Sequence, residues 1–546
     1  MPFRPDGTRT GVVLLPPSRH LPQAATLGDP PAGDRLAGDR PATVVHGWLA
    51  RWAADPAAPA LLDVAGDAST VAGHRHAGGA WWTSGELEDA TRRAGLAWRS
   101  AGFDPGQRIV WSTRSSVAAL VSHLGAVRAG LVVVPVPTAA TARELAHVAA
   151  TVRPSGAVLD DPTRAAALAQ PGAPVVASGP GLDGLPALRP AGDGAPLDSV
   201  APSDPALILF TSGTTGAPKG AVLSHANLVA GTASVVAAWR WEPADRLLHT
   251  LPIYHAHGLA VGVYGTLLAG ASAALFPSFD PEAVLDAAGA GEGTLYFGVP
   301  TMYHRLAATG RSAQLGRLRL CVSGSAPLAA DLHRRLAASA TPVLERYGMS
   351  ETLMLVSNPV DGERRAGTVG FPLPGVEVRL AGSAGDGAAG DSAAGGEVLV
   401  RGANVFAGYF ERPAATAEAF EPDPDGGAPW FRTGDLGIEE DGYLVLRGRR
   451  TDLIISGGAN VYPAEVEDVL AAHPSVAEVA VTGEPSDEWG EVVVAWVVAA
   501  GAPDEAALVA HAAAQLAPYK RPRRYRFVDE LPRNAMGKVV RASLRP

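Results

Sequence analysis

The segment Thr211-Ser-Gly-Thr-Thr-Gly-Ala-Pro-Lys-Gly220 combines glycines, hydroxyl side chains and a lysine. Glycines let the backbone turn sharply and present N–H groups to an anion, while the hydroxyls and Lys219 add donors and a positive charge. The spacing differs from the Walker A motif, which needs four residues between its first glycine and a Gly-Lys pair. The segment therefore predicts a phosphate-binding loop. We expect the following residues to form it: Thr211, Ser212, Gly213, Thr214, Thr215, Gly216 and Lys219.

The elements around this loop alternate between helices and strands. The apolar run Leu207–Phe210 predicts a buried strand that leads into the loop, and Leu131–Val134 predicts another. Ser115 and Ser116 can cap a helix that precedes the second strand, and Thr141 with Glu144 has capping-box spacing for the helix that follows it. This alternation is typical of an α/β fold with mainly parallel sheet.

The character of the chain changes after Arg449. Asp441-Gly442 predicts a hairpin turn, and the helical pattern near residues 465–471 lies before strand-like runs at 476–482 and 491–499. We therefore predict a poorly ordered extension over residues 1–42, a large α/β domain over 43–449 with several subdomains, and a small α+β domain over 450–546. The stretch from Gly382 to Gly396, rich in Gly, Ala, Ser and Asp, predicts an exposed connection.

Composition excludes several classes of protein. The chain has 546 residues and a formal net charge of −10, which disfavours binding to nucleic acid through phosphates. Cys321 is the single cysteine, so a disulfide framework or a multi-cysteine metal site within the chain is excluded. No apolar run reaches the roughly 18 residues that a membrane span needs. These observations predict a cytoplasmic protein without nucleic-acid or membrane partners.

Further segments complete a pattern that begins with the predicted loop. They are Tyr347-Gly-Met-Ser-Glu-Thr352, Phe431-Arg-Thr-Gly-Asp-Leu436, Gly448-Arg-Arg-Thr-Asp452 with Ile455-Ser-Gly-Gly458, and Pro532-Arg-Asn-Ala-Met-Gly-Lys538. In this order they resemble the motifs of the adenylate-forming superfamily of acyl- and aryl-CoA synthetases, adenylation domains and luciferases. The resemblance covers about residues 44–546.

The resemblance implies a two-step reaction. The acid attacks ATP to give an acyl-adenylate and pyrophosphate, and the thiol of CoA then takes the acyl group. It implies catalytic roles for Lys538, Glu351 and Thr215, with Glu351 and Thr215 on Mg²⁺, and places Asp435 and Arg449 at the ribose or phosphates. Further ATP-binding residues are implied: Ser325, Ala326, Pro327, Glu345, Arg346, Tyr347, Gly348 and Ser350.

The resemblance also implies that the small domain moves. It would present Lys538 for the first step and the segment Ser456, Gly457 and Gly458 for the second. The hinge position maps to Thr451, where family members commonly have Asp or Lys.

The segments Leu251–Gly258, Phe297–Arg305 and Tyr347–Met354 look most like those of malonyl-CoA synthetases, which implies malonate or methylmalonate as the acid. An unreacted second carboxylate needs a cationic partner, and the resemblance offers Arg305 for that role. The other implied acid-pocket residues are His255, His257, Ser323, Gly324, Gly348 and Met349.

Other features keep alternatives open. The stretch Ile455-Ser-Gly-Gly-Ala-Asn-Val-Tyr-Pro463 is similar to that of general fatty-acid and aryl ligases, so a medium-chain or aromatic acid is the alternative substrate. Transfer to a carrier protein rather than to CoA is a further alternative.

Overall fold

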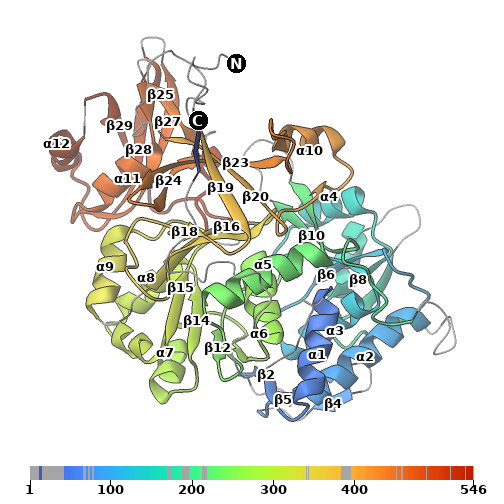
Figure 1. Ribbon diagram of the computed structural model, residues 1–546. Coiled ribbons are helices and arrows are strands. Elements are labelled where there is room, and N and C mark those ends of the chain that lie inside the picture. The colour runs from blue at the N-terminus through green and yellow to red at the C-terminus, as the bar shows by residue number, and fades with distance from the viewer. Residues whose placement is uncertain are drawn as a thin grey trace.

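The computed structural model describes residues 12–14, 42–65, 69–71, 74–76, 79–168, 174–186, 188, 196–211, 218–339, 341, 343–382, 395–449, 452–456, 459–486, 489–516, 518–534 and 537–544. Figure 1 shows a large body of sheets and helices, with the orange-red C-terminal part lying beside the yellow segment that carries α8 (Pro300–Ala308) and α9 (Ala330–Ala338). This mixed α/β architecture, with a large and a small domain, confirms the predicted fold class.

The first sheet carries the predicted phosphate loop. Its strands lie in the order β21 (Gly408–Tyr409), β11 (Lys219–Ser224), β10 (Pro205–Thr211), β7 (Val132–Pro135), β6 (Arg108–Ser112), β8 (Gly156–Leu159) and β9 (Val175–Ser178). The strands from β10 to β9 run parallel, whereas β11 and β21 add antiparallel pairs at one edge. The two strands predicted next to the loop are β10 and β7.

Helices alternate with the early strands, and the last two of those named next start at the predicted caps. They are α1 (Val44–Ala54), α2 (Ser84–Ser100), α3 (Val117–Arg128) and α4 (Ala142–Val152). The Ser116 hydroxyl accepts a hydrogen bond from the Ala119 N–H at 3.1 Å, which caps α3. Thr141 and Glu144 form both bonds of the capping box at the start of α4. Side-chain oxygens thus satisfy N–H groups that have no partner inside the helix.

The second sheet is built mainly from parallel strands of the middle of the chain. Its order is β18 (Phe371–Pro372), β17 (Leu353–Ser357), β16 (Val343–Met349), β15 (Leu320–Ser323), β14 (Leu295–Gly298), β12 (Arg246–His249), β13 (Ser272–Leu275), β2 (Pro59–Asp63) and β5 (Trp82–Thr83). The helices α5 (His225–Ala238), α6 (Tyr264–Ala269) and α7 (Pro281–Ala290) join α8 and α9 in this part of the chain. A π-helical segment, His257–Val263, precedes α6.

An antiparallel sheet joins the large body to the C-terminal part. Its order is β1 (Val12–Leu14), β19 (Val376–Gly382), β20 (Gly396–Gly402), β23 (Trp430–Glu440) and β22 (Phe420–Glu421), with β24 (Tyr443–Arg449) also on β23 and α10 (Pro413–Ala419) nearby in the chain. The β23–β24 hairpin turns at Asp441-Gly442, as predicted, with φ of 50° and 85°. A separate hairpin pairs β3 (Ser69–Val71) with β4 (His74–His76).

The predicted extension differs from the structure at three residues. Val12–Leu14 form the edge strand β1, which pairs with β19. Two β-branched residues and a leucine suit such a strand. The rest of residues 1–41 lies outside the described part, as does most of the predicted connection 382–396.

The strands after Arg449 form a sheet of their own. Its order is β26 (Ala459–Val461), β25 (Ile454–Ser456), β28 (Gly490–Ala499) and β27 (Val476–Ser486), and β29 (Arg524–Phe527) pairs with β28. The helices α11 (Pro463–Ala471) and α12 (Glu505–Gln515) pack on it around a core that includes Ile454, Val466, Val481, Val493 and Leu508. This separate core makes the C-terminal part a structural unit, while the boundary at residue 450 stays a prediction.

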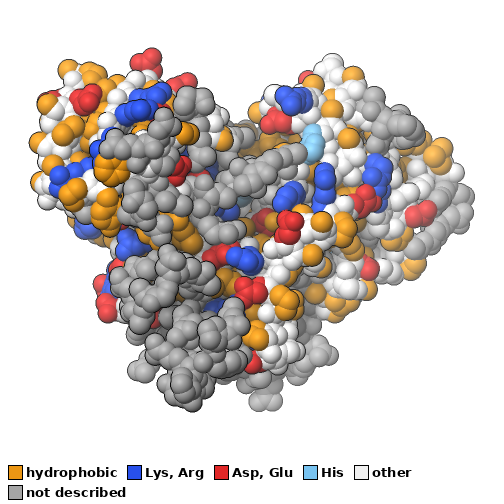
Figure 2. Space-filling view, turned by 90° about the horizontal axis from the view of Figure 1, so that it is seen from above, with side chains coloured by type: hydrophobic (Ala, Val, Ile, Leu, Met, Phe, Trp, Pro, Cys, Tyr) orange, Lys and Arg blue, Asp and Glu red, His pale blue; other side chains and the backbone are white. Residues whose placement is uncertain are grey.

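Charges on the surface alternate in sign. In Figure 2, Lys and Arg side chains lie interspersed with Asp and Glu over the described part of the face. Among the described residues, no helix combines the length and apolar character that a membrane crossing requires.

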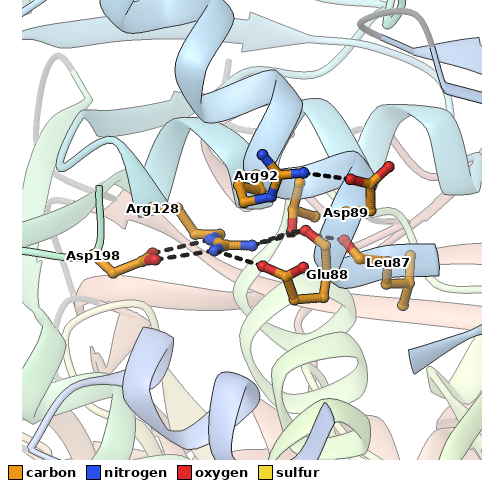
Figure 3. Close-up of polar contacts among 7 residues, drawn as sticks. Leu87, Glu88, Asp89, Arg92, Arg128 and Asp198 are labelled. Carbon is orange, nitrogen blue, oxygen red and sulfur yellow. Dashed lines mark hydrogen bonds and ion pairs between the residues drawn. The ribbon is translucent and has the colours of Figure 1, made fainter. Parts of the chain in front are cut away.

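One buried arginine ties the helices of the first sheet together (Figure 3). The Arg128 guanidinium, on a side chain 3% exposed, donates to both carboxylate oxygens of Asp198 at 2.9 Å. It also donates to the Glu88 carbonyl at 2.9 Å and to the Thr91 hydroxyl at 2.8 Å. The end of α3, the middle of α2 and the segment before β10 are therefore joined at one charged group.

We predict that Arg128→Met lowers the free energy of unfolding of the large domain by about 3 kcal/mol, because the partners of a buried charge lose their donor. Arg92→Met is the matched control, since Arg92 pairs with Asp89 at 2.5 Å but is 43% exposed, and its loss should stay below about 1 kcal/mol. Urea unfolding followed by fluorescence measures both. Equal losses in the two variants would contradict the role given to Arg128.

Candidate active site

The candidate site is built at the ends of parallel strands. Ser323 ends β15, Thr211 ends β10, and β16 carries the run from Glu345 to Gly348. Loops at the carboxyl ends of parallel strands form the ligand crevice of open α/β sheets. The predicted residues therefore gather where such a fold places its ligands.

Asp435 is the centre of one group of predicted residues. Its carboxylate accepts a short hydrogen bond from the Tyr347 hydroxyl. It also forms an ion pair with the Arg449 guanidinium, whose Nε lies 2.6 Å from Oδ1. Burial raises the pKa of Asp435, while Arg449 and the Tyr347 hydrogen bond act in the opposite direction. The group thus presents an oriented carboxylate and a guanidinium side by side.

The small domain brings Lys538 to this group. Lys538 lies after a tight turn, in which its N–H donates to the Asn534 side chain at 3.0 Å and the Gly537 N–H donates to the Asn534 carbonyl at 2.8 Å. Gly537 has φ of 73°, and a Cβ there would lie 3.4 Å from the Thr301 hydroxyl on α8. The Lys538 side chain keeps contact with solvent. Partial desolvation and then Arg449 lower its pKa, and Asp435 opposes them.

Glu351 and Lys219 both contact Tyr409, a residue that lies outside the predicted motifs. The Tyr409 hydroxyl donates to Glu351 Oε1 at 3.0 Å, and the Lys219 ammonium lies 5.0 Å from the centre of the Tyr409 ring. Burial raises the pKa of Glu351, and the Tyr409 hydrogen bond lowers it. Sequence reasoning missed Tyr409, because a lone Gly-Tyr pair carries no recognisable chemical pattern.

A second group of predicted residues surrounds a buried guanidinium. Arg346 is 4% exposed, and its Nε and Nη2 have no hydrogen-bond partner among the described residues. Burial lowers its pKa to about 9. Gly324 gives it room, since a Cβ at that position would lie 2.3 Å from Arg346 Cζ. His257 Nε2, beside it, is also buried without a hydrogen-bond partner among the described residues. Ser323 Oγ is likewise buried and unpartnered among those residues, but Ser323 pairs with Glu345 across β15 and β16.

The two predicted histidines lie beside this guanidinium as neutral rings. Burial and then Arg346 lower the pKa of His255 to about 4 and that of His257 well below its usual value. His257 Nδ1 lies 3.5 Å from the Ser325 hydroxyl, and its ring stacks on Phe297 at 6.3 Å. These histidines are therefore hydrogen-bonding groups rather than cations at neutral pH.

Arg305 occupies a different position. It stacks on the Phe279 ring at 4.9 Å and remains exposed at the edge of a cavity of about 200 Å³. The cavity is also lined by Leu251, Met302 and Gly537. Arg305 therefore lies at the rim of a cavity that the lysine-bearing loop of the small domain covers.

Glu345 forms hydrogen bonds with backbone groups of neighbouring segments. Its carboxylate accepts hydrogen bonds from the N–H groups of Leu328 at 3.2 Å and Gly367 at 3.4 Å, and its carbonyl accepts one from the Asn358 N–H at 2.9 Å. Burial raises the pKa of Glu345 to about 8, the two N–H donors oppose this, and Asp468 of the small domain adds to it. Glu345 thus connects loops around the site.

The remaining predicted residues divide into three sets. Thr211, Ser325, Ala326, Pro327, Gly348, Met349 and Ser350 lie partly exposed on the loops and strand ends around these groups. Ser456 is buried in the sheet of the small domain, where it pairs with Ala459 and Gly490. Ser212, Gly213, Thr214, Thr215, Gly216, Thr451, Gly457 and Gly458 lie outside the described residues.

Comparison with known proteins places the chain in a family. Residues 50–410 match the family described as AMP-binding enzyme, and residues 465–538 match the AMP-binding enzyme C-terminal domain. This protein therefore belongs to the AMP-binding enzymes of the adenylate-forming superfamily. Within that class it is an AMP-forming acyl-CoA ligase, as its relatives are. The predicted family and enzyme class are thereby confirmed.

Three curated relatives act on different acids. The chain is 36% identical to the sulfoacetate–CoA ligase of Cupriavidus necator, covering 85% of this chain and 92% of the relative. It is 37% identical to a feruloyl-CoA synthase of Amycolatopsis sp, over 86% and 94%. It is 37% identical to the mitochondrial malonate–CoA ligase of Mus musculus, over 62% and 64%.

A solved structure shares the fold at closer identity. ATP-bound MatB from Rhodopseudomonas palustris is 40% identical with a TM-score of 0.82, covering 92% of this chain and 98% of that one.

We predict that Glu345→Gln changes the pH dependence of stability. The pKa of folded Glu345, about 8, exceeds its ordinary value of 4.5, so the folded state binds this proton more tightly and loses stability as pH rises between these values. The glutamine does not titrate. The thermal midpoint of the variant minus that of the parent should therefore grow from about pH 5 to about pH 8, by circular dichroism. A constant difference would contradict the raised pKa.

Proposed function

We propose that this acyl-CoA ligase activates a small acid that carries a second anionic group, with malonate or methylmalonate favoured. The first carboxylate attacks the α-phosphorus of ATP, which releases pyrophosphate and forms the acyl-adenylate. The thiol of CoA then displaces AMP and forms the thioester. ATP and CoA are the cosubstrates of this reaction.

The observation that carries this proposal is the Arg346 guanidinium. A buried charge with unpartnered donors is costly unless an anion completes it, and a planar guanidinium suits a carboxylate or sulfonate. His257 Nε2, beside it, is buried without a hydrogen-bond partner among the described residues and can supply a further polar contact. A purely hydrocarbon or aromatic tail would leave these groups unpaired.

The relatives support the same acid class. Sulfoacetate and malonate both carry an anionic group beyond the carboxylate that is activated. The neutral histidines allow the pocket to hold one negative charge near one arginine without excess positive charge. We therefore assign Arg346 to the distal anion and Arg305 to the rim of the cavity, where it attracts the acid.

The Asp435 group is suited to ATP. Asp435 can accept hydrogen bonds from ribose hydroxyls, and Arg449 beside it can contact ribose or phosphate. Tyr347 holds the Asp435 carboxylate in place and offers its ring to the base. Lys538 then brings a positive charge to the phosphates as negative charge develops there, which is the kind of stabilisation that speeds phosphoryl chemistry.

Glu351 fits a Mg²⁺ ion. It is a carboxylate 4% exposed that has no ion-pair partner among the described residues, and it shares Tyr409 as a contact with Lys219. Oxygen ligands of this kind suit Mg²⁺, which takes the rest of its shell from phosphates and water. When bound, the ion neutralises charge on the phosphates. We assign Thr215 as its second protein contact by the same resemblance.

A medium-chain or aromatic acid is the alternative, and the similarity to feruloyl-CoA synthase favours an aromatic one. Transfer to a carrier protein in place of CoA and a cytoplasmic location remain predictions. Rotation of the small domain about Thr451, with Ser456 to Gly458 serving the second step, also remains a proposal.

We predict that Arg346→Met lowers kcat/KM for malonate by about 100-fold, as loss of a buried charge partner does, and changes that for butyrate by less than about 3-fold. An AMP-release assay over malonate, methylmalonate, sulfoacetate, butyrate, octanoate and benzoate, with the same acids for Arg305→Leu, measures this. The thermal midpoint of Arg346→Met should not fall, because methionine removes an unpaired buried charge.

Gly324→Ala is a second test of the same pocket. Its Cβ would displace the guanidinium, so it should reproduce the loss for malonate, whereas Gly501→Ala, with nothing within 4 Å, should not. Equal losses for mono- and dicarboxylates in Arg346→Met, or parent turnover with octanoate or benzoate but none with diacids, would overturn the acid class.

We predict that Lys538→Ala lowers acid-dependent pyrophosphate exchange by at least about 100-fold, because one charged donor to the transition state is lost. Thioester formation from preformed acyl-adenylate should change by less than about 3-fold. Lys520→Ala is the control: Lys520 also lies in the small domain but pairs with Glu465 at 2.6 Å. Equal loss of both half-reactions would show that Lys538 is not specific to adenylation.

A further inference from the structure

The segment from Asn404 to Tyr409 holds the turn that carries Glu351. The Asn404 side-chain amide donates to the Thr352 carbonyl at 2.8 Å and to the Met354 carbonyl at 3.1 Å. The Phe406 N–H donates to the Glu351 carbonyl at 2.8 Å. The backbone at Glu351 and at the residues just after it is therefore fixed by one short segment.

Tyr409 ends this segment and contacts two groups of opposite charge. Its hydroxyl donates to Glu351 Oε1 at 3.0 Å, and its ring face lies 5.0 Å from the Lys219 ammonium. A hydrogen bond to a carboxylate fixes its orientation, whereas a cation–π contact of roughly 0.5–1 kcal/mol is weak enough for a phosphate to compete with it. The hydrogen bond from Tyr409 to Glu351 is therefore the stronger of the two contacts, and the cation–π contact with Lys219 is the weaker.

The position of Tyr409 is itself well determined. Tyr409 pairs with Ala221 across β21 and β11, two residues beyond Lys219. Its N–H donates to the Thr416 hydroxyl at 3.0 Å, and its ring contacts Phe406 edge-on at 4.9 Å. Gly408 has φ of 152° and lies so close to Thr416 that a Cβ would approach Cγ2 to 2.5 Å. The ring thus has little freedom to leave the site.

We propose that Tyr409 is a positioning residue. Its hydroxyl orients Glu351 toward Mg²⁺, and its ring holds the Lys219 ammonium over the ring face before ATP arrives. This inference rests on the proposed function, in which Glu351 binds the ion that accompanies ATP. The hydroxyl acts on the metal carboxylate and the ring acts on the lysine. The two contacts can therefore be removed separately.

Calorimetric titration of the full-length protein with ATP, with and without Mg²⁺, tests this inference independently of turnover. Tyr409→Phe keeps the ring and removes the hydroxyl. We expect ATP affinity without Mg²⁺ to change by less than about 2-fold and the enhancement by Mg²⁺ to fall by about 10-fold, as losses of groups that orient metal ligands do. The Mg²⁺ concentration for half-maximal activity should rise by a similar factor, with little change in kcat at saturating Mg²⁺.

Tyr409→Leu removes the ring as well, so it should also weaken ATP binding without Mg²⁺, by about 3-fold for a contact of this strength. Tyr443→Phe is the matched control, because its hydroxyl donates to the Glu363 carbonyl at 2.9 Å, outside the groups assigned to the site. That variant should keep the parent's Mg²⁺ enhancement.

The outcomes separate the inference from the proposed function. If Glu351→Gln abolishes the Mg²⁺ enhancement but Tyr409→Phe retains it, the positioning role is wrong and the metal assignment stands. If Tyr409→Phe weakens ATP binding equally with and without Mg²⁺, the role is merely structural and the inference fails. If the parent shows no Mg²⁺ enhancement, the metal assignment fails, and the inference falls with it.

Discussion

The Arg346 guanidinium constrains the residues around it, because a charge removed from water costs several kcal/mol when no partner completes it. The surrounding residues follow from that constraint. Position 324 has no side chain, since a Cβ would meet the guanidinium, and both histidines beside it are held neutral. The fold therefore sustains a buried, unpaired guanidinium, which the proposed function completes with an anion of the substrate.

In the group around Asp435, by contrast, the charges are paired within the protein. The Asp435 carboxylate has both Arg449 and Tyr347 as partners. Such a group is held in one orientation by its own contacts, so in the proposed function it would orient the nucleotide at little entropic cost. The proposed function thus assigns the internally paired charges to ATP and the unpaired guanidinium to the acid.

Much of the fold was readable from local chemistry. The caps at Ser116 and Thr141, the strand before the phosphate loop and the Asp441-Gly442 hairpin depend on neighbours within a few residues, and each is present. β1 was missed because its pairing with β19 depends on residues more than 360 positions away. Tertiary pairing of this kind has no local signal.

The candidate site was predictable where residues belong to contiguous motifs, and Asp435, Tyr347, Arg449 and Lys538 do meet. The positions of two arginines depend on tertiary packing. Arg346 is predicted among the ATP-binding residues, which stays a prediction, and its burial beside Gly324 and the histidines is the basis for proposing it in the acid pocket instead. Arg305 was expected to face a buried carboxylate, yet it is exposed on Phe279. Spacing along a strand cannot tell which of two arginines ends up without a partner.

The pairing of β11 with β21 has a consequence for how the protein becomes competent. Ala221 and Tyr409 are brought together across nearly 190 residues of chain, so this edge of the sheet cannot form until the intervening chain has been made. During synthesis the phosphate-loop strand leaves the ribosome long before its partner strand does. A nascent chain can thus bury most of its large domain while the catalytic apparatus is still incomplete, which separates acquiring a fold from acquiring an activity.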